Sequence, residues 1–156
     1  MQKKFLLTLM GFFIISIVLM GCSGGKKVIS GEDFSKVLEE QGYTLTDESE
    51  ANKKLTNSYI NASDADTGNT FLFIDFIKEE EAANFFETTH QNLHGIEHNY
   101  QNPTNVEESG SNFQYQELTT DDDFYRVIKV KDTILYLEAT IFQKDEVLEI
   151  VEKLGY

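Results

Sequence analysis

The three histidines are the residues whose spacing most directly suggests chemistry. His90, His94 and His98 are the only histidines in the chain and lie four residues apart. On a continuous helix this spacing places the imidazoles along one side over about two turns. Neutral imidazoles at positions i and i+4 suit zinc or copper, and Glu97 offers an additional oxygen ligand. The stretch is therefore a candidate metal site, with His90 and His94 as its ligands.

The rest of the predicted helix argues against all three histidines acting together. Four residues at helical spacing form the face expected to be buried: Ala82, Phe86, Thr89 and Leu93. Relative to that face, His90 lies at the flank, whereas His94 and His98 rotate progressively outward. Gly95 can also end the helix before His98. The sequence alone thus favours a histidine-rich solvated face, with specific metal binding as the alternative.

Two groups of acidic residues are weaker candidates. The run from Asp64 to Gly68 begins like a calcium-binding loop, but the later acidic ligands of such a loop are missing, and we predict a turn. Asp75 and Glu138 lie at corresponding positions of two similar segments and could form an acid/base pair if burial separated their pKa values. Solvated carboxylates at strand ends are the favoured interpretation of this second pair.

Composition and motifs argue against an enzyme and against nucleic-acid binding. The chain has 27 acidic and 13 basic residues, and its formal net charge of -14 repels nucleic acid. A single Cys precludes an intrachain disulfide and a cysteine-rich zinc site. No G-x-S-x-G motif and no glycine-rich phosphate loop occur, and all histidines fall within nine residues. We predict no catalytic residues and no cofactor.

The first 20 residues have the features of an export signal. Two lysines, Lys3 and Lys4, precede the apolar run from Phe5 to Met20. As a helix, this run would be about 24 Å long, shorter than the roughly 30 Å hydrocarbon core of a bilayer. A cleaved signal therefore fits this run better than a permanent membrane span.

The residues after this run indicate how the chain is anchored. Leu19-Met20-Gly21-Cys22 resembles the lipobox of bacterial lipoproteins, and the chain is similar to small surface lipoproteins of Gram-positive bacteria. This resemblance implies that residues 1–21 are a signal peptide and that Cys22 carries a diacylglycerol on its sulfur. It also implies a location on the extracytoplasmic face of the cell membrane. The alternative is an incidental thiol beside a plain membrane anchor.

Residues 22–28 are then a short lipidated tether, and residues 29–156 form a single α+β domain. Helices are predicted at 30–41, 79–94 and 144–154. Strands are predicted at 43–47, 57–62, 70–77, 112–119, 124–131 and 133–142. The segments 70–75 and 133–138 agree in residue class at every position, which suggests an opening helix followed by two βββα repeats. The sheet should be mainly antiparallel and packed by helices.

Local signals define several helix ends and one strand register. Ser30 is a predicted N-cap, and the pairs Gly42-Tyr43 and Gly155-Tyr156 are predicted C-terminal caps. A hairpin turn at Asp121-Asp122 with arms of equal length places Glu117 opposite Arg126, the only Arg of the chain. We favour a cross-strand ion pair over ligand binding for this arginine.

Residues 95–111 are polar and rich in Asn and Gly, which is typical of a mobile connection or a binding loop. The function best supported by the sequence is a non-catalytic binding module, anchored by lipid to the outer face of the membrane. Its partner would be another envelope protein or a peptide, bound through the sheet or through residues 95–111. The alternative function is a metal-binding lipoprotein that uses His90 and His94.

Overall fold

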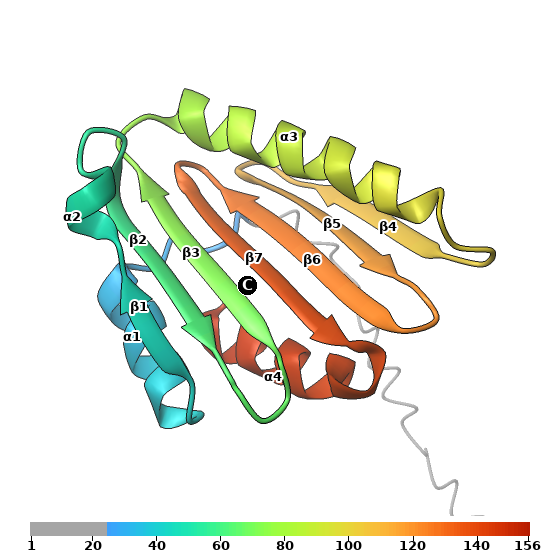
Figure 1. The fold of residues 1–156 in the computed structure, drawn as a ribbon. Helices are drawn as coiled ribbons and strands as arrows, with labels where there is room; N and C mark the ends of the chain where they lie inside the picture. Colours follow the sequence, from blue (N-terminus) through green and yellow to red (C-terminus); the bar gives the residue numbers. More distant parts are fainter. Residues whose placement is uncertain (1–24) are drawn as a thin grey trace, which may run out of the picture.

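The computed structural model describes residues 25–156, which form a seven-stranded antiparallel sheet with helices on both faces (Figure 1). The four α-helices are α1 (Gly31–Glu40), α2 (Ser49–Asn52), α3 (Glu79–Glu97) and α4 (Lys144–Leu154). The strands are β1 (Thr44–Asp47), β2 (Thr56–Ser63), β3 (Thr70–Phe76), β4 (Thr104–Ser109), β5 (Phe113–Thr119), β6 (Asp123–Val130) and β7 (Thr133–Thr140). Their order across the sheet is β1-β2-β3-β7-β6-β5-β4. The predicted signal peptide and Cys22 lie outside the described residues.

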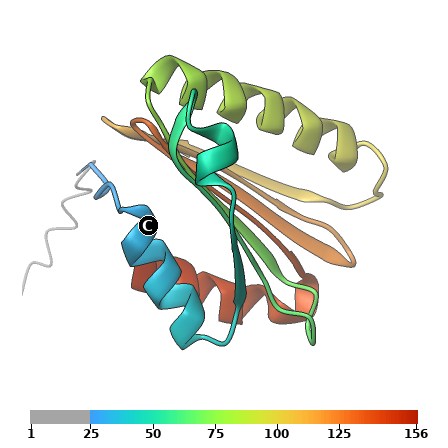
Figure 2. The same cartoon turned by 60° about the vertical axis from the view of Figure 1, so that its left-hand side comes forward.

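The two faces of the sheet carry separate hydrophobic cores (Figure 2). Helices α1 and α4 cover one face, here called the closed face, and α3 covers the other, here called the α3 face. On β3, Phe71 and Phe73 pack into the core of the closed face, whereas Ile74 packs into the core under α3. This alternation follows from the pleat of a strand, which points successive side chains to opposite faces. Each face thus receives its own set of residues from the same strands.

The predicted helix caps are confirmed. The Ser30 hydroxyl accepts a hydrogen bond from the Asp33 amide at 3.1 Å, and the Asp33 carboxylate accepts one from the Ser30 amide at 3.3 Å. Gly42 and Gly155 both have φ of 88°, and the amide that follows each glycine bonds back to a carbonyl of the preceding helix. Glycine has no Cβ to clash in this left-handed conformation, so both helices end without backbone strain.

The predicted hairpin register is confirmed as well. Strands β5 and β6 pair with Tyr115 opposite Ile128 and Glu117 opposite Arg126. The Arg126 guanidinium lies 3.8 Å from the Glu117 carboxylate and 4.6 Å from the centre of the Tyr115 ring. Arg126 therefore has the structural role that the sequence favours.

The segment 95–111 differs from the prediction. Instead of a loop throughout, it holds the end of α3 and the edge strand β4, which pairs with β5. Helix α3 continues through Gly95 to Glu97, because Gly95 lies in open space and its missing side chain removes no packing contact. A further short helix, α2, follows β1 and was also not predicted.

The pattern of two βββα repeats is not confirmed. The two similar segments pair directly with each other, as neighbours β3 and β7 in the centre of the sheet. Their matched positions nevertheless face opposite sides: Phe71 lies in the core of the closed face, whereas its counterpart Ile134 lies under α3. The helices that follow the two strands accordingly cover opposite faces. The second half also contains four strands rather than three.

Candidate metal centre

Helix α3 and edge strand β4 bring two imidazoles and one carboxylate together. His90 and His94 lie one turn apart on α3, and each Nε2 atom is 3.3 Å from Oε1 of Glu107 on β4. Phe86 and Leu93 are buried under α3 and fix the face that the helix turns toward the sheet. The ring of Phe86 also stacks on His90, with centroids 6.1 Å apart. We call His90, His94 and Glu107 the His-Glu cluster.

The spacing within this cluster matches that of a metal site. In a tetrahedral zinc site with bonds of about 2.0–2.1 Å, ligand atoms lie roughly 3.3–3.4 Å from one another. Both separations between the imidazole Nε2 atoms and Glu107 are 3.3 Å, and the ligand atoms of the three residues all lie within 4.8 Å of one another. The cluster is thus close to the geometry needed for three of four tetrahedral ligands.

A second layer of polar residues orients His94. Its Nδ1 atom lies 2.9 Å from Oε2 of Glu97, and the side-chain amide of Asn105 donates to the same Glu97 oxygen at 3.2 Å. The side-chain amide of Gln116 on β5 donates to Oδ1 of Asn105 at 3.3 Å, and Gln116 is fully buried. Metal-binding histidines commonly hold their second ring nitrogen to a carboxylate in this way. Among residues 25–156, the Oε1 atom of Gln116 has no hydrogen-bond partner, so the buried network is incomplete.

The contact with Glu97 constrains where the protons of His94 lie. An ionised carboxylate only accepts hydrogen bonds, so the tautomer of His94 that donates to Glu97 carries its proton on Nδ1. In a neutral imidazole, Nε2 then presents a lone pair to the Glu107 oxygen 3.3 Å away. Two acceptor atoms facing each other repel unless a proton or a cation lies between them. A metal ion bound at this point would remove the repulsion and use both lone pairs.

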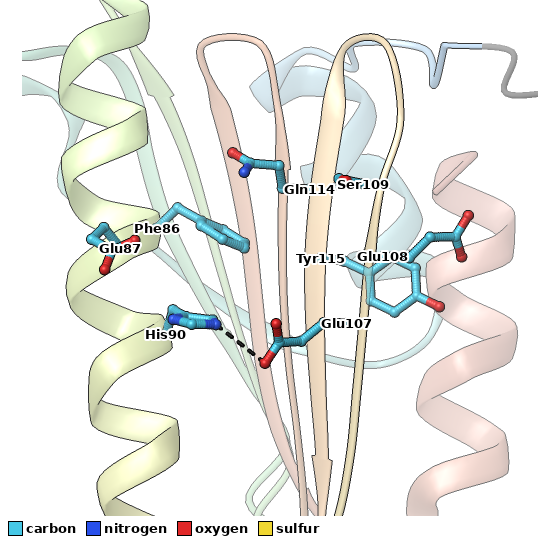
Figure 3. A pocket seen from close by; sticks show the side chains of 8 residues that line it. All are labelled: Phe86, Glu87, His90, Glu107, Glu108, Ser109, Gln114 and Tyr115. Carbon is cyan, nitrogen blue, oxygen red and sulfur yellow. Dashed lines mark ion pairs between the residues drawn. The ribbon is translucent and has the colours of Figure 1, made fainter.

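A solvent-open cavity of about 400 Å³ gives access to the cluster (Figure 3). His90 reaches from α3 and Glu107 from β4 to meet at one side of it, and Phe86 lies beside them. Its lining also includes the acidic residues Glu87 and Glu108. Carboxylates around the cavity attract cations, and the open space leaves room for a water molecule as a fourth ligand.

Only some of the predicted metal ligands lie together in the structure. His90 and His94 are brought together, whereas His98 is the exposed C-cap of α3 and lies outside the cluster. Glu97, the predicted oxygen ligand, instead contacts Nδ1 of His94, on the side of the ring away from the cluster. Glu107 contacts Nε2 and lies where the oxygen ligand was predicted. Sequence reasoning missed Glu107 because residues 95–111 were expected to form a loop. The alternation of Asn105 and Glu107 was the available signal, since strand residues two apart share a face.

The two acidic groups behave as their simpler interpretations predict. Asp64 caps the turn between β2 and β3, where it accepts hydrogen bonds from the Thr67 hydroxyl at 2.6 Å and the Asp66 amide at 2.9 Å. These bonds lower the pKa of Asp64 below its usual value. Asp75 and Glu138 lie at opposite ends of the paired strands β3 and β7, opposite Thr133 and Thr70. At about 3.3 Å per residue, roughly 17 Å of strand separates them, too far for an acid/base pair.

Comparisons with known proteins identify no family. No family model and no curated protein matches the chain. A solved structure described as a GTP binding regulator from Thermotoga maritima is similar over 81% of this chain and 85% of its own, with a TM-score of 0.47 and 14% sequence identity. Similarity at this level assigns no activity. Within residues 25–156, no helix is both long and apolar enough to cross a membrane.

Proposed function

We propose that this protein is a non-catalytic metal-binding lipoprotein, in which His90, His94 and Glu107 bind one divalent transition-metal ion. The observation that carries the proposal is the convergence of two imidazole nitrogens on one carboxylate oxygen at 3.3 Å each. Nitrogen donors favour zinc, copper or nickel over magnesium and calcium, which prefer all-oxygen sites. Zinc and copper are the ions that the histidine spacing also predicts.

The surroundings of the site support reversible binding. The side chains of His90, His94 and Glu107 are 24%, 41% and 49% exposed, so a bound ion stays in contact with water. Three protein ligands leave a coordination position open, which lets the ion exchange with an incoming ligand. The strong acidic excess of the chain raises the local concentration of cations. These features suit capture and release of an ion at the cell surface.

Calorimetric titration of residues 23–156 with zinc or copper tests the metal site. This part contains the whole sheet and both cores, so it should fold on its own, and it lacks the Cys22 thiol that would compete for metal. We expect one site at least about 100-fold tighter than a millimolar surface association. The pair His90→Ala and His94→Ala should abolish it, whereas His98→Ala should leave it intact. Millimolar binding by the unaltered protein, or no effect of the paired substitutions, would refute the site.

The lipid anchor is tested separately in cells. Its support is the resemblance of Leu19-Met20-Gly21-Cys22 to a lipobox. Cys22→Ala should prevent lipidation and cleavage, so the chain should keep residues 1–21 and migrate as a larger precursor without the two acyl chains of the stable anchor. An unchanged processed size together with unchanged membrane fractionation would remove the anchor from the account.

A peptide- or protein-binding role is a second candidate, favoured by one observation. Strand β4 lies at the edge of the sheet, and five of its six residues are exposed. Exposed edge strands can add a further strand from a partner. A photo-crosslinking residue at Val106 on β4 should capture a partner that the same residue at the exposed Phe142 does not. Identical products at both positions would argue against recognition through β4.

A further inference from the structure

The first described residues are held firmly to one end of the sheet. The Lys26 amide donates to Oδ1 of Asn112 at 2.9 Å, and the Asn112 side-chain amide donates back to the Lys26 carbonyl at 2.8 Å. Val28 packs against the core of the closed face, and Ile29 is buried in it. Four peptide steps separate Cys22 from Lys26, so a lipid on Cys22 is at most about 14 Å from the point of attachment.

Asn112 belongs to a continuous end of the sheet, which we call the anchor end. The Lys131 amide donates to the Asn112 carbonyl, and the Phe76 amide donates to the Asp132 carbonyl. The Ile77 amide in turn donates to the Leu55 carbonyl. These bonds connect the turns beside β5, β7, β3 and β2 across one end of the sheet, at which the chain enters the described fold (Figures 1 and 2). A bilayer within 14 Å of Lys26 must therefore face this end.

Two large apolar side chains are exposed at the anchor end. Leu55 and Ile77 are 53% and 50% exposed and line one small hollow together with Lys54, Lys78 and Glu81. Isolated exposed apolar residues are ordinary, but here two lie side by side with lysines beside them. Apolar side chains flanked by lysine suit the boundary between acyl chains and headgroups, where the lysine stem stays in the apolar layer and the ammonium reaches the phosphates.

The anchor end of the sheet is less acidic than the opposite end. Six lysines lie at or next to the anchor end: Lys26, Lys27, Lys53, Lys54, Lys78 and Lys131. Acidic residues at this end bring its charge close to balance, and two of them, Glu50 and Glu79, are paired with Lys53 and Lys129. The turns at the opposite end carry mainly aspartates: Asp64, Asp66, Asp121, Asp122 and Asp123. An anionic bilayer therefore repels the far end more strongly than the anchor end.

We propose that the anchor end docks on the bilayer surface, with Leu55 and Ile77 at the level of the headgroups and Lys54 and Lys78 on their phosphates. This inference rests on the lipid anchor of the proposed function, but not on metal binding. Helix α3 starts at this end, and His90 lies eleven residues along it, about 16 Å from its start. The docked orientation would thus hold the His-Glu cluster away from the lipid and open to water.

Tethered vesicles test the orientation without relying on lipidation in cells. Cys22 is the only Cys, so a maleimide lipid couples residues 22–156 to vesicles of phosphatidylcholine and phosphatidylglycerol at one defined point. The chain has no Trp, so Ile77→Trp introduces a single indole at the proposed contact and Phe142→Trp introduces one at an exposed position of the far end. Brominated lipids should quench Ile77→Trp at least about twofold and shift its emission to the blue, while Phe142→Trp stays unchanged.

Each outcome of this experiment decides the orientation. Adding Lys54→Glu and Lys78→Glu to the Ile77→Trp protein should weaken the quenching, with far-UV circular dichroism confirming an unchanged fold. Equal quenching of the two indoles, or none in either while the protein remains coupled, would overturn the proposal. A blue shift of Ile77→Trp on concentrating the uncoupled protein without vesicles would instead assign the surface to a second copy of the chain. Because the coupling is chemical, failure here is distinct from failure of lipidation or of metal binding.

Discussion

Two carboxylates on neighbouring strands of one sheet end up in opposite electrostatic situations. Glu117 on β5 faces the closed face, where Lys144 at 2.7 Å and Arg126 at 3.8 Å hold it with permanent positive charges. Glu107 on β4 faces α3, where two imidazoles approach it at 3.3 Å. Lysine and arginine complete an ion pair at any ordinary pH, whereas imidazoles need a proton to do so. The first group is therefore a finished structural pair, and the second is suited to take up a cation.

Glu117 and Glu107 also differ in the residues that surround them. The ammonium of Lys144 makes further contacts on the closed face: it donates to the Thr119 hydroxyl at 3.0 Å and lies 4.6 Å from the centre of the Phe124 ring. Buried polar atoms without a partner among residues 25–156 occur beside both groups, at Nε of Arg126 and at Oε1 of Gln116. Such an atom costs free energy on either face, so the contacts of the two carboxylates, and not these atoms, distinguish the groups. Under the proposed function, the carboxylate of the closed face stabilises the fold, whereas the carboxylate under α3 binds the ion.

Glu107→Gln should have the largest effect. A neutral amide replaces the charged oxygen ligand, so zinc affinity should fall by about 100-fold or more, since even loss of an outer contact costs 10- to 100-fold. The free energy of unfolding without metal should change little, because Glu107 is half exposed. Calorimetry with zinc and urea unfolding of the metal-free protein measure the two quantities. Zinc binding that survives this substitution would place the ion elsewhere.

Alkaline pH should destabilise both faces of the sheet. Burial raises the pKa of Tyr156 in the closed core and of Tyr125 under α3 to about 12, from an ordinary value near 10. The unfolded chain ionises first, so the stability is fully present below about pH 10 and is lost as the pH rises toward 12. The loss should be roughly 2–3 kcal/mol for each tyrosine.

Urea unfolding across this pH range measures the alkaline effect, with tyrosinate absorbance as an independent readout. Tyr156→Phe and Tyr125→Phe should each flatten the decline, because phenylalanine does not ionise. A decline that begins well below pH 10, or one unchanged in both variants, would contradict burial of these tyrosines.

Glu97→Gln should have an intermediate effect on metal binding. The substitution keeps the shape of the side chain but weakens its hold on Nδ1 of His94, so zinc affinity should fall about 10- to 100-fold. Calorimetric titration checks the change, and Glu87→Gln is a matched control, because Glu87 lines the nearby cavity without contacting either histidine in the structure. An effect as small as that of the control would mean that Glu97 does not orient His94.

Glu117→Gln should have the smallest effect and should act on stability alone. It removes the charge between Lys144 and Arg126, both partly buried, and should lower the free energy of unfolding by about 1–2 kcal/mol. Zinc affinity should stay unchanged, because Glu117 faces away from α3. A clear loss of zinc binding in this variant would remove the distinction between the two carboxylates.

Much of the fold could be predicted because its signals are local. Ser30, Gly42 and Gly155 mark helix ends through their own backbone chemistry, and the turn at Asp121-Asp122 sets the register of Glu117 and Arg126. Each of these signals needs only a few neighbouring residues to be read. Most of the predicted helices and strands therefore agree with the structure to within two or three residues.

The parts that were missed depend on contacts distant in sequence. Strand β4 is polar because it lies at an edge and is mostly exposed, so its composition is that of a loop until β5 pairs with it. Glu107 reaches the histidines only through that pairing and through the packing of α3 on the sheet. His90 and His94 could be chosen from spacing alone, but their shared partner could not.

Diffraction from crystals grown with zinc, measured at its absorption edge, tests the central claim most directly. The account predicts one strong anomalous peak about 2.0–2.1 Å from Nε2 of His90, Nε2 of His94 and Oε1 of Glu107. A structure with zinc bound only at other residues, and with both imidazoles still directed at Glu107, would contradict it.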